Sequence, residues 1–292
     1  MISWLLRIFL VTTVCMAPLD GGFAVAGKLD EIQQIRKIVL GYRKDAFPFS
    51  FEDESGNPAG YSIDLCRNVI VNYIQKEVLQ MPELSIEWVQ VSVKDRIEKV
   101  FSGAVSMECG ATTITYDRQQ WVDFSHIIYV SGAKLLVKVD SSVRGVEDLN
   151  GRKIAVLADT TTEFVIDKIL RDKNINADLI RVREHEDGLN SLINGDIDAY
   201  AADHALLYGL LYRLRSQISK EYRLVGRFLS YEPYGIALPR DDSAFRRAVN
   251  LALSQHFRSG AIELTYSRWF DPLDLPPDDI FIAAVVLQSI PE

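Results

Sequence analysis

The stretch GAVSMECGATT, residues 103–113, decides the fold class of this sequence. Its first glycine ends a helical pattern at 95–101, residues 104–109 predict a strand, and a polar loop follows at 110–113. The same order returns 92 residues later, where Gly195 ends a helical pattern and DIDAY at 196–200 predicts a strand. This succession of helix, glycine, strand and polar loop is typical of an α/β protein.

A second repeat has a different spacing and involves other strands. Arg36-Lys37-Ile38 begins a β-branched strand pattern over 36–42, and Arg152-Lys153-Ile154 begins another strand 116 residues later. In between, apolar residues spaced three and four apart predict a helix over 63–78, and residues 86–91 predict a strand. The alternation predicts βα units with parallel sheets, arranged in two similar lobes. The alternative, that any two βα units share this much likeness, stays open.

Composition excludes two broad classes of protein. Of the 292 residues, 48% are hydrophobic and 25% are charged, which is typical of a folded globular chain and not of a disordered one. Lys and Arg total 32 against 40 Asp and Glu, a net charge of −8, which argues against nucleic-acid binding. An anionic ligand must therefore be held by cations placed locally.

The first 26 residues have the layout of a secretory signal peptide. A positive charge at Arg7 precedes an apolar run over 8–17, and Ala24-Val25-Ala26 is a small-x-small cleavage site. We predict an exported, periplasmic protein whose mature chain starts at Gly27, with an uncleaved anchor as the alternative. The apolar run at 280–287 has eight residues, too few for a membrane span.

The sequence predicts no metal, no cofactor and no catalytic residues. The four histidines, at 126, 185, 204 and 256, lack metal-ligand spacing, and neither a CxxC nor a GxSxG motif occurs. Two cysteines remain after cleavage, Cys66 and Cys109. They either form a disulfide, as an oxidising compartment allows, or stay as two buried thiols.

Loops that follow strands are the places where α/β proteins bind ligands, here residues 43–49, 110–118, 159–163 and 203–204. Arg118 suits a carboxylate, and Thr113 can add hydrogen bonds to it. Thr160-x-x-Glu163 fits a capping box, and the helix that it starts offers free N–H groups to an anion. Asp203 can accept from an ammonium group. As structural alternatives, Thr160 merely starts a helix and Asp203 merely caps the next one.

Three further cations lie in loops or at a helix start: Arg43, Arg96 and His185. Each alone is most simply a solvated surface charge. Only their joint placement in the predicted cleft favours a functional role.

Several motifs together resemble the periplasmic polar amino-acid-binding proteins of ABC importers, solute-binding protein family 3, and more narrowly the glutamate/aspartate-binding branch. They are Arg43 to Phe51, GYSIDL at 60–65, ECGATT at 108–113 with Asp117-Arg118, VDFS at 122–125, GRK at 151–153, TTTE at 160–163 and ADHALL at 202–207. The similarity covers essentially the whole mature chain.

The resemblance implies a two-lobed, type II periplasmic-binding-protein fold with the ligand cleft between lobes joined by two crossovers. We expect lobe 1 at 27–129 and 234–292 and lobe 2 at 130–233. The implied partners are an amino-acid ligand and a membrane permease, and we expect a monomer.

The resemblance also implies roles for the site residues. Arg118 and Thr113 hold the α-carboxylate with help from Thr160, Thr161 and Thr162, and Asp203 takes the α-ammonium group. Arg43, Arg96 and His185 hold a side-chain carboxylate, and an Arg at position 43 disfavours cationic ligands. The predicted ligand-binding set is Arg43, Arg96, Ala111, Thr113, Arg118, Thr160, Thr161, Thr162, His185 and Asp203. The chain departs from the branch at Ala111 and Val93, where serine is usual.

Three alternatives stay open from the sequence. The ligand could be another polar amino acid or a small anion, because Ala111 and Val93 remove hydroxyl partners. A dehydratase-like enzyme on the same fold would use Asp203, Glu163 or His185 as its acid or base. A binding protein that presents its ligand to a sensor is the third.

Overall fold

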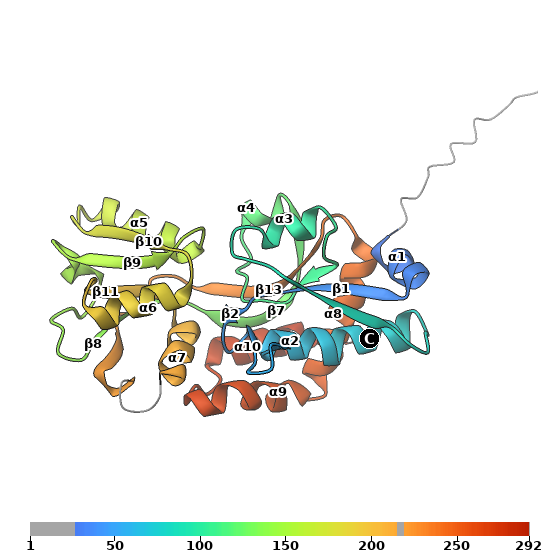
Figure 1. Ribbon diagram of the computed structural model, residues 1–292. Helices are drawn as coiled ribbons and strands as arrows, with labels where there is room; N and C mark the ends of the chain where they lie inside the picture. The colour runs from blue at the N-terminus through green and yellow to red at the C-terminus, as the bar shows by residue number, and fades with distance from the viewer. Residues whose placement is uncertain (1–26, 215–218, 292) are drawn as a thin grey trace, which may run out of the picture.

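The computed structural model describes residues 27–214 and 219–291, and its two large sheets lie side by side with helices around them (Figure 1). The predicted signal peptide at 1–26 lies outside the described residues. Within those two ranges, none of the helices has the length and apolar character that crossing a membrane requires.

The strands are short and alternate with helices along the chain. They are β1 (Lys37–Tyr42), β2 (Asp45–Ala46), β3 (Ser50–Glu52), β4 (Pro58–Ala59), β5 (Ser85–Gln90), β6 (Met107–Glu108), β7 (Val122–Ser131), β8 (Ala133–Lys138), β9 (Lys153–Leu157), β10 (Asp178–Val182), β11 (Ala199–Asp203), β12 (Tyr222–Val225) and β13 (Glu232–Pro239).

The α-helices are α1 (Lys28–Ile35), α2 (Tyr61–Asp64), α3 (Arg96–Phe101), α4 (Tyr116–Gln119), α5 (Thr161–Asp172), α6 (His185–Asn194), α7 (His204–Arg213), α8 (Ser243–Arg258), α9 (Ala261–Phe270) and α10 (Asp279–Gln288). The helix predicted over 63–78 is α2 followed by two π-helical segments, η1 (Leu65–Val71) and η2 (Ile74–Val78). Short 3₁₀ turns are η3 (Val146–Leu149), η4 (Ser219–Glu221) and η5 (Asp271–Leu273).

The two sheets share one topology. Their orders are β5-β1-β6-β13-β7 and β10-β9-β11-β8-β12, and a small sheet β2-β3-β4 follows β1. In each large sheet four strands run in one direction, and the fourth strand in the order, β13 or β8, runs antiparallel to its neighbours on both sides. The prediction of parallel sheets was therefore wrong for β8 and β13. Short connections lead from β7 into β8 and from β12 into β13, so β8 and β13 each enter their sheet directly from the other sheet and not through a crossover helix.

The sequence repeats mark strands at equivalent places in the two sheets. β1 and β9 begin 116 residues apart, at Lys37 and Lys153, and each lies second in its sheet. β6 and β11 begin 92 residues apart, at Met107 and Ala199, and each lies third. The two-lobed α/β fold is thus confirmed.

The chain passes twice between the sheets, from Ser131 to Ala133 and from Val225 to Glu232. The two passages touch, because a Cβ atom added to Gly132 would lie 2.4 Å from the carbonyl oxygen of Ser230. The exact lobe limits, 27–129 with 234–292 and 130–233, stay a prediction.

Each sheet has its own core. An aromatic cluster fills the first lobe, where Phe49 lies edge-on to Tyr129 and Tyr234 with ring centroids 4.9 and 5.2 Å away. In the second lobe, strand β9 sends Ile154 and Val156 into one core, and Ala155 and Leu157 into another. This alternation is the period of two that a strand buried on both faces requires.

A disulfide joins Cys66, on η1, to Cys109, directly after β6, with their Cα atoms 6.3 Å apart. Of the two possibilities that the sequence left open, the structure therefore has the bridge. The bond fastens the start of the polar loop 110–113 to the helical wall of the first lobe.

Candidate functional site

Six strand ends, three from each sheet, supply the site. The parallel strands β1, β5 and β6 end on one side of it, and β9, β10 and β11 end on the other. Arg43 follows β1, Arg96 follows β5, and the loop 110–113 follows β6; Thr160 to Thr162 follow β9, His185 follows β10, and Asp203 ends β11. The carboxyl ends of parallel strands are where open α/β sheets bind ligands.

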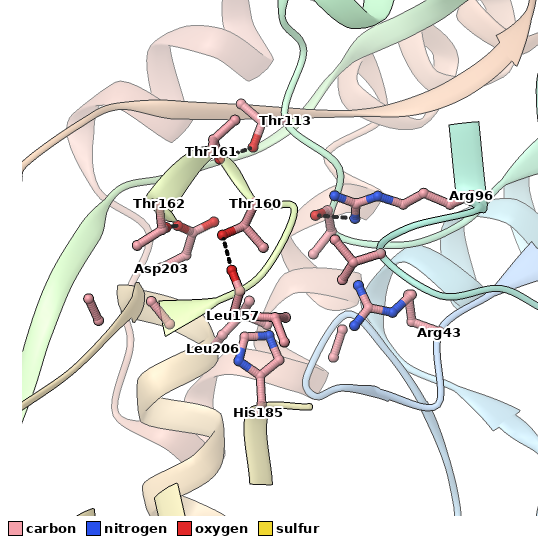
Figure 2. A pocket seen from close by; sticks show the side chains of 15 residues that line it. Arg43, Arg96, Thr113, Leu157, Thr160, Thr161, Thr162, His185, Asp203 and Leu206 are labelled. Carbon is pink, nitrogen blue, oxygen red and sulfur yellow. Dashed lines mark hydrogen bonds between the residues drawn. The ribbon is translucent and has the colours of Figure 1, made fainter. Parts of the chain in front are cut away.

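A pocket lies between these strand ends. In Figure 2, Arg43 and Arg96 enter it from one side, Asp203 and the threonines from the other, and His185 from below. Its lining comprises Arg43, Ala46, Val93, Arg96, Ala111, Thr113, Leu157, Thr160, Thr161, Thr162, His185, Ala201, Ala202, Asp203 and Leu206. The structure thus brings together every predicted site residue except Arg118.

Sequence analysis missed the small and apolar part of this lining, namely Ala46, Leu157, Ala201, Ala202 and Leu206. Their position near the ends of predicted strands could have identified some of them: Leu157 ends β9, and Ala201 and Ala202 lie near the end of β11. Such residues carry no chemistry of their own and shape the space around the polar groups.

Arg96 is a buried cation without an ion-pair partner among the described residues. It opens α3, its residue is only 4% exposed, and its Nη1 donates to the carbonyl oxygen of Ala111 at 3.3 Å. Its Nε has no hydrogen-bond partner. Burial, together with the nearby charges of Arg118 and Arg43, lowers the pKa of Arg96 to about 9, although Glu108 opposes that shift. An anion in the pocket would offset the free-energy cost of burying the charged guanidinium.

Arg43 is also buried, but it has a partner. Its Nη2 lies 2.5 Å from Oδ1 of Asp45, two residues along in β2. Its backbone N–H donates to the hydroxyl of Ser50 at 2.9 Å, which holds the loop after β1 in place.

His185 is not a cation in this site, which corrects its assignment from sequence. It is 4% exposed at the start of α6, and burial lowers the pKa of His185 to about 4, so the ring is neutral at pH 7. Its Nδ1 lies 2.7 Å from the hydroxyl of Tyr200. It can therefore offer a ligand hydrogen bonding but no charge at neutral pH.

Asp203 forms the acidic side of the pocket. Its Oδ1 accepts from the Thr162 hydroxyl at 2.9 Å, and its Oδ2 accepts from the Tyr234 hydroxyl. Burial and the carboxylate of Glu232 raise the pKa of Asp203 to about 6. Asp203 is the N-cap residue of α7, yet its side chain makes no capping hydrogen bond. The alternative that this side chain merely caps the next helix was therefore wrong.

The Thr160 segment begins α5 as the sequence predicts. The Thr160 hydroxyl accepts from the backbone N–H of Glu163 at 3.1 Å and donates to the carbonyl oxygen of Leu157 at 2.7 Å. The second half of the predicted capping box differs, because the Glu163 side chain accepts from the N–H of Asp159 instead of Thr160. The Thr161 and Thr113 hydroxyl groups, one from each lobe, hydrogen-bond to each other at 3.4 Å.

Arg118 lies beside the pocket, half-buried, and is not part of its lining. Its Nη1 donates to the carbonyl oxygen of Thr113 at 2.7 Å, which ties α4 to the polar loop. Burial lowers the pKa of Arg118, against the opposing charges of Glu108, Glu232 and Asp203. Its predicted contact with a ligand carboxylate stays a prediction.

Glu108 is a functional candidate that sequence analysis did not single out. It is fully buried at the end of β6, and its Oε2 accepts from the Thr112 hydroxyl at 2.8 Å while Oε1 has no partner. A Cβ atom on Gly110 would lie 2.0 Å from Oε1, so a larger residue at 110 would force this carboxylate to move. Glu108 is the through-space counter-charge of Arg96 and Arg118.

In the described ranges, 27–214 and 219–291, no group of three or more His, Cys, Asp or Glu side chains is placed to hold a metal ion. The chemistry of the pocket is instead that of paired opposite charges in a water-poor space. Two guanidinium groups line one wall, and a carboxylate with three threonines lines the other. Fold and site together define a two-lobed protein that binds a small charged molecule.

Comparison with known proteins agrees with that class. The chain belongs to the family of bacterial extracellular solute-binding proteins, family 3, which it matches over residues 38–272. It is 33% identical to an L-glutamate/L-aspartate-binding protein of Pseudomonas aeruginosa, over 92% of this chain and 89% of that one. It is 29% identical to an ABC transporter glutamine-binding protein of Bacillus subtilis, over 87% of this chain and 90% of that one.

A solved structure shares the fold. It is the ancestral amino acid-binding protein AncCDT-1, a precursor of cyclohexadienyl dehydratase, with a TM-score of 0.70 and 26% identity. The likeness covers 83% of this chain and 99% of that one.

Proposed function

We propose that this protein is the binding component of an ABC-type importer and that its ligand is an acidic amino acid, L-glutamate or L-aspartate. In this proposal it works in the periplasm after loss of residues 1–26, and a membrane permease receives the ligand. It binds its ligand without converting it.

The observation that carries the proposal is Arg96. A guanidinium that is 4% exposed and has no ion-pair partner among the described residues leaves a buried positive charge that the Glu108 carboxylate offsets only through space. Such a charge is costly unless an anion joins it. Arg96 lines the pocket, so the anion that best satisfies it is part of the ligand.

Other groups of the lining supply what the other end of an amino acid needs. On the opposite wall, the Asp203 carboxylate can accept from an α-ammonium group, and the N-terminus of α5 can donate to an α-carboxylate. Thr113 can donate to the same α-carboxylate from the loop after β6. Arg118 would strengthen that carboxylate site from beside the pocket. Arg43, Arg96 and neutral His185 would then surround the side-chain carboxylate.

Titration of ligand-stripped protein against the twenty common amino acids tests the proposal by calorimetry. We expect heat from L-glutamate or L-aspartate and none from lysine or arginine. Tight binding of lysine or arginine, with none of glutamate or aspartate, would overturn the acidic-ligand assignment. Mass spectrometry of the ligand recovered after long incubation tests the enzyme alternative, and we expect it unchanged.

A further inference from the structure

The two cations of the pocket differ in one respect. The Arg43 side chain is 5% exposed and lies 2.5 Å from the carboxylate of Asp45, whose side chain is 11% exposed. Arg43 lines the pocket, and Asp45 does not. The Asp45 carboxylate therefore lies outside the lining of the pocket, and its ion pair with Arg43 is nearly dry.

Arg96 has no such carboxylate within ion-pair distance among the described residues. The remaining basic group of the lining, His185, is neutral at pH 7, because burial lowers the pKa of His185 to about 4. A ligand side chain between Arg43 and Arg96 therefore meets one cation in direct contact with a carboxylate and one cation whose counter-charge, Glu108, acts only through space.

We propose that Asp45 is a specificity-determining residue: its carboxylate cancels the charge of Arg43, so that the pocket accepts amide side chains alongside carboxylate side chains. The substrate class becomes acidic amino acids together with their amides, with the acid favoured by Arg96 alone. This inference rests on the proposed function, because it concerns the side-chain end of that same pocket.

The physical basis is the range of a buried charge. Arg43 screens the Asp45 carboxylate from the ligand but does not abolish its field, because charges separated by one guanidinium group still interact strongly at low dielectric. At an effective dielectric of about 20 and a separation of about 6 Å, one unit charge changes an equilibrium roughly a hundredfold. Asp45 should thus lower the preference for glutamate over glutamine by roughly ten- to a hundredfold.

The direct test is Asp45→Asn, which keeps an oxygen acceptor for Arg43 and removes only the charge. We expect the ratio of glutamate to glutamine affinity, measured by calorimetry at pH 8, to rise at least about tenfold. Glu87→Gln is the matched control, because it removes one carboxylate from a surface pair with Lys37 in the same lobe. That control should leave the ratio as in the wild type.

A second comparison keeps the inference testable if Asp45→Asn fails to fold. Arg43→Gln alone leaves the Asp45 carboxylate unbalanced, whereas Arg43→Gln with Asp45→Asn removes both charges of the pair. We expect the double variant to have a glutamate-to-glutamine ratio at least about tenfold higher than Arg43→Gln alone.

The outcomes separate cleanly. Equal ratios in Asp45→Asn and wild type, or in the single and double Arg43 variants, would overturn the inference. A lower ratio in Asp45→Asn would also overturn it, because Asp45 would then act by positioning Arg43. Failure of the wild type to bind any acidic amino acid would instead overturn the proposed function, before any variant is made.

Discussion

At the scale of single residues, the pocket is a set of buried charges whose balance depends on burial. Burial disfavours the charged form of Arg96 and lowers the pKa of its guanidinium to about 9. Burial and the Glu232 carboxylate disfavour the charged form of Asp203 and raise the pKa of its carboxyl group to about 6. A ligand that carries both an anionic group and an ammonium group would favour the charged forms of Arg96 and Asp203. The charges of the free pocket therefore suit a zwitterion.

The first prediction concerns Arg96→Met, which removes the charge and keeps most of the length. Glutamate affinity should fall by about 2–5 kcal/mol, while the ligand-free protein keeps or gains thermal stability because an unpaired buried charge is gone. Calorimetry and a thermal melt measure the two effects. Lys99→Met, on the same helix and paired with Asp95, is the control. A variant that loses stability but not affinity would contradict the ligand role.

The second prediction is a pH dependence set by Asp203. Only the ionised carboxyl attracts an ammonium group, so glutamate affinity should fall up to about tenfold per pH unit below pH 6. Because the pKa of Asp203 is raised in the folded protein, its contribution to ligand-free stability is present below about pH 4. That contribution is lost as pH rises through about 6.

Calorimetry between pH 5 and 7.5 in buffers of different ionisation enthalpy should show proton release on binding. The groups around Asp203 that share its field are Glu232, Arg118, Tyr234 and Thr162. His185 and His204 do not compete in this window, because burial lowers the pKa of each to about 4. Equal affinities at pH 5 and 7.5 would contradict the prediction, and Asp203→Asn should bind weakly without pH dependence.

At the scale of elements, the strand ends place the site, and the disulfide steadies one of them. Cys109 directly precedes the loop 110–113. Its bond to Cys66 on η1 links two positions that are 43 residues apart in the sequence. Directly beside the bond, Glu108 packs so closely against Gly110 that a Cβ atom there would lie 2.0 Å from its Oε1. The bond therefore supports the pocket wall that Ala111 and Thr113 supply.

The third prediction is that Cys66→Ser with Cys109→Ser lowers the free energy of unfolding by about 2–5 kcal/mol. Glutamate affinity should weaken less, because the loop keeps its hydrogen bonds to Ser62 and Arg118. Chemical denaturation under non-reducing conditions measures the first effect, with reduced wild type as the comparison. Equal midpoints for variant and oxidised wild type would contradict a stabilising role.

At the scale of the whole molecule, contacts between the lobes surround the pocket. Phe47 after β2 stacks on Tyr212 of α7 with centroids 5.8 Å apart, and Lys44 lies 2.7 Å from Glu184. The backbones approach so closely that a Cβ atom on Gly209 would lie 2.4 Å from the carbonyl oxygen of Phe47. These contacts lie outside the pocket and can form only when the lobes are together.

The fourth prediction follows from that approach. Gly209→Ala should hinder full closure of the two lobes, so glutamate affinity should fall while the lobes stay folded. At saturating glutamate, the radius of gyration of the variant should exceed that of the wild type. Gly145→Ala is the control, since its Cβ would meet only the flexible Glu147 side chain, at 3.0 Å. Solution scattering with and without ligand decides, and a variant that compacts as fully as wild type would refute this closure contact.

The sequence by itself determined the two-lobed α/β fold and the strand ends that form the pocket. Strand, helix and turn signals act over a few residues, so local patterns locate the strand ends, while the 116- and 92-residue repeats and the family resemblance together indicate two equivalent lobes. Only the tertiary structure decided that Cys66 meets Cys109, that His185 is neutral, and that Asp45 balances Arg43 while Arg96 stays unpaired. Charge states and ion pairs depend on burial and on distances between segments remote in sequence, which no local pattern encodes.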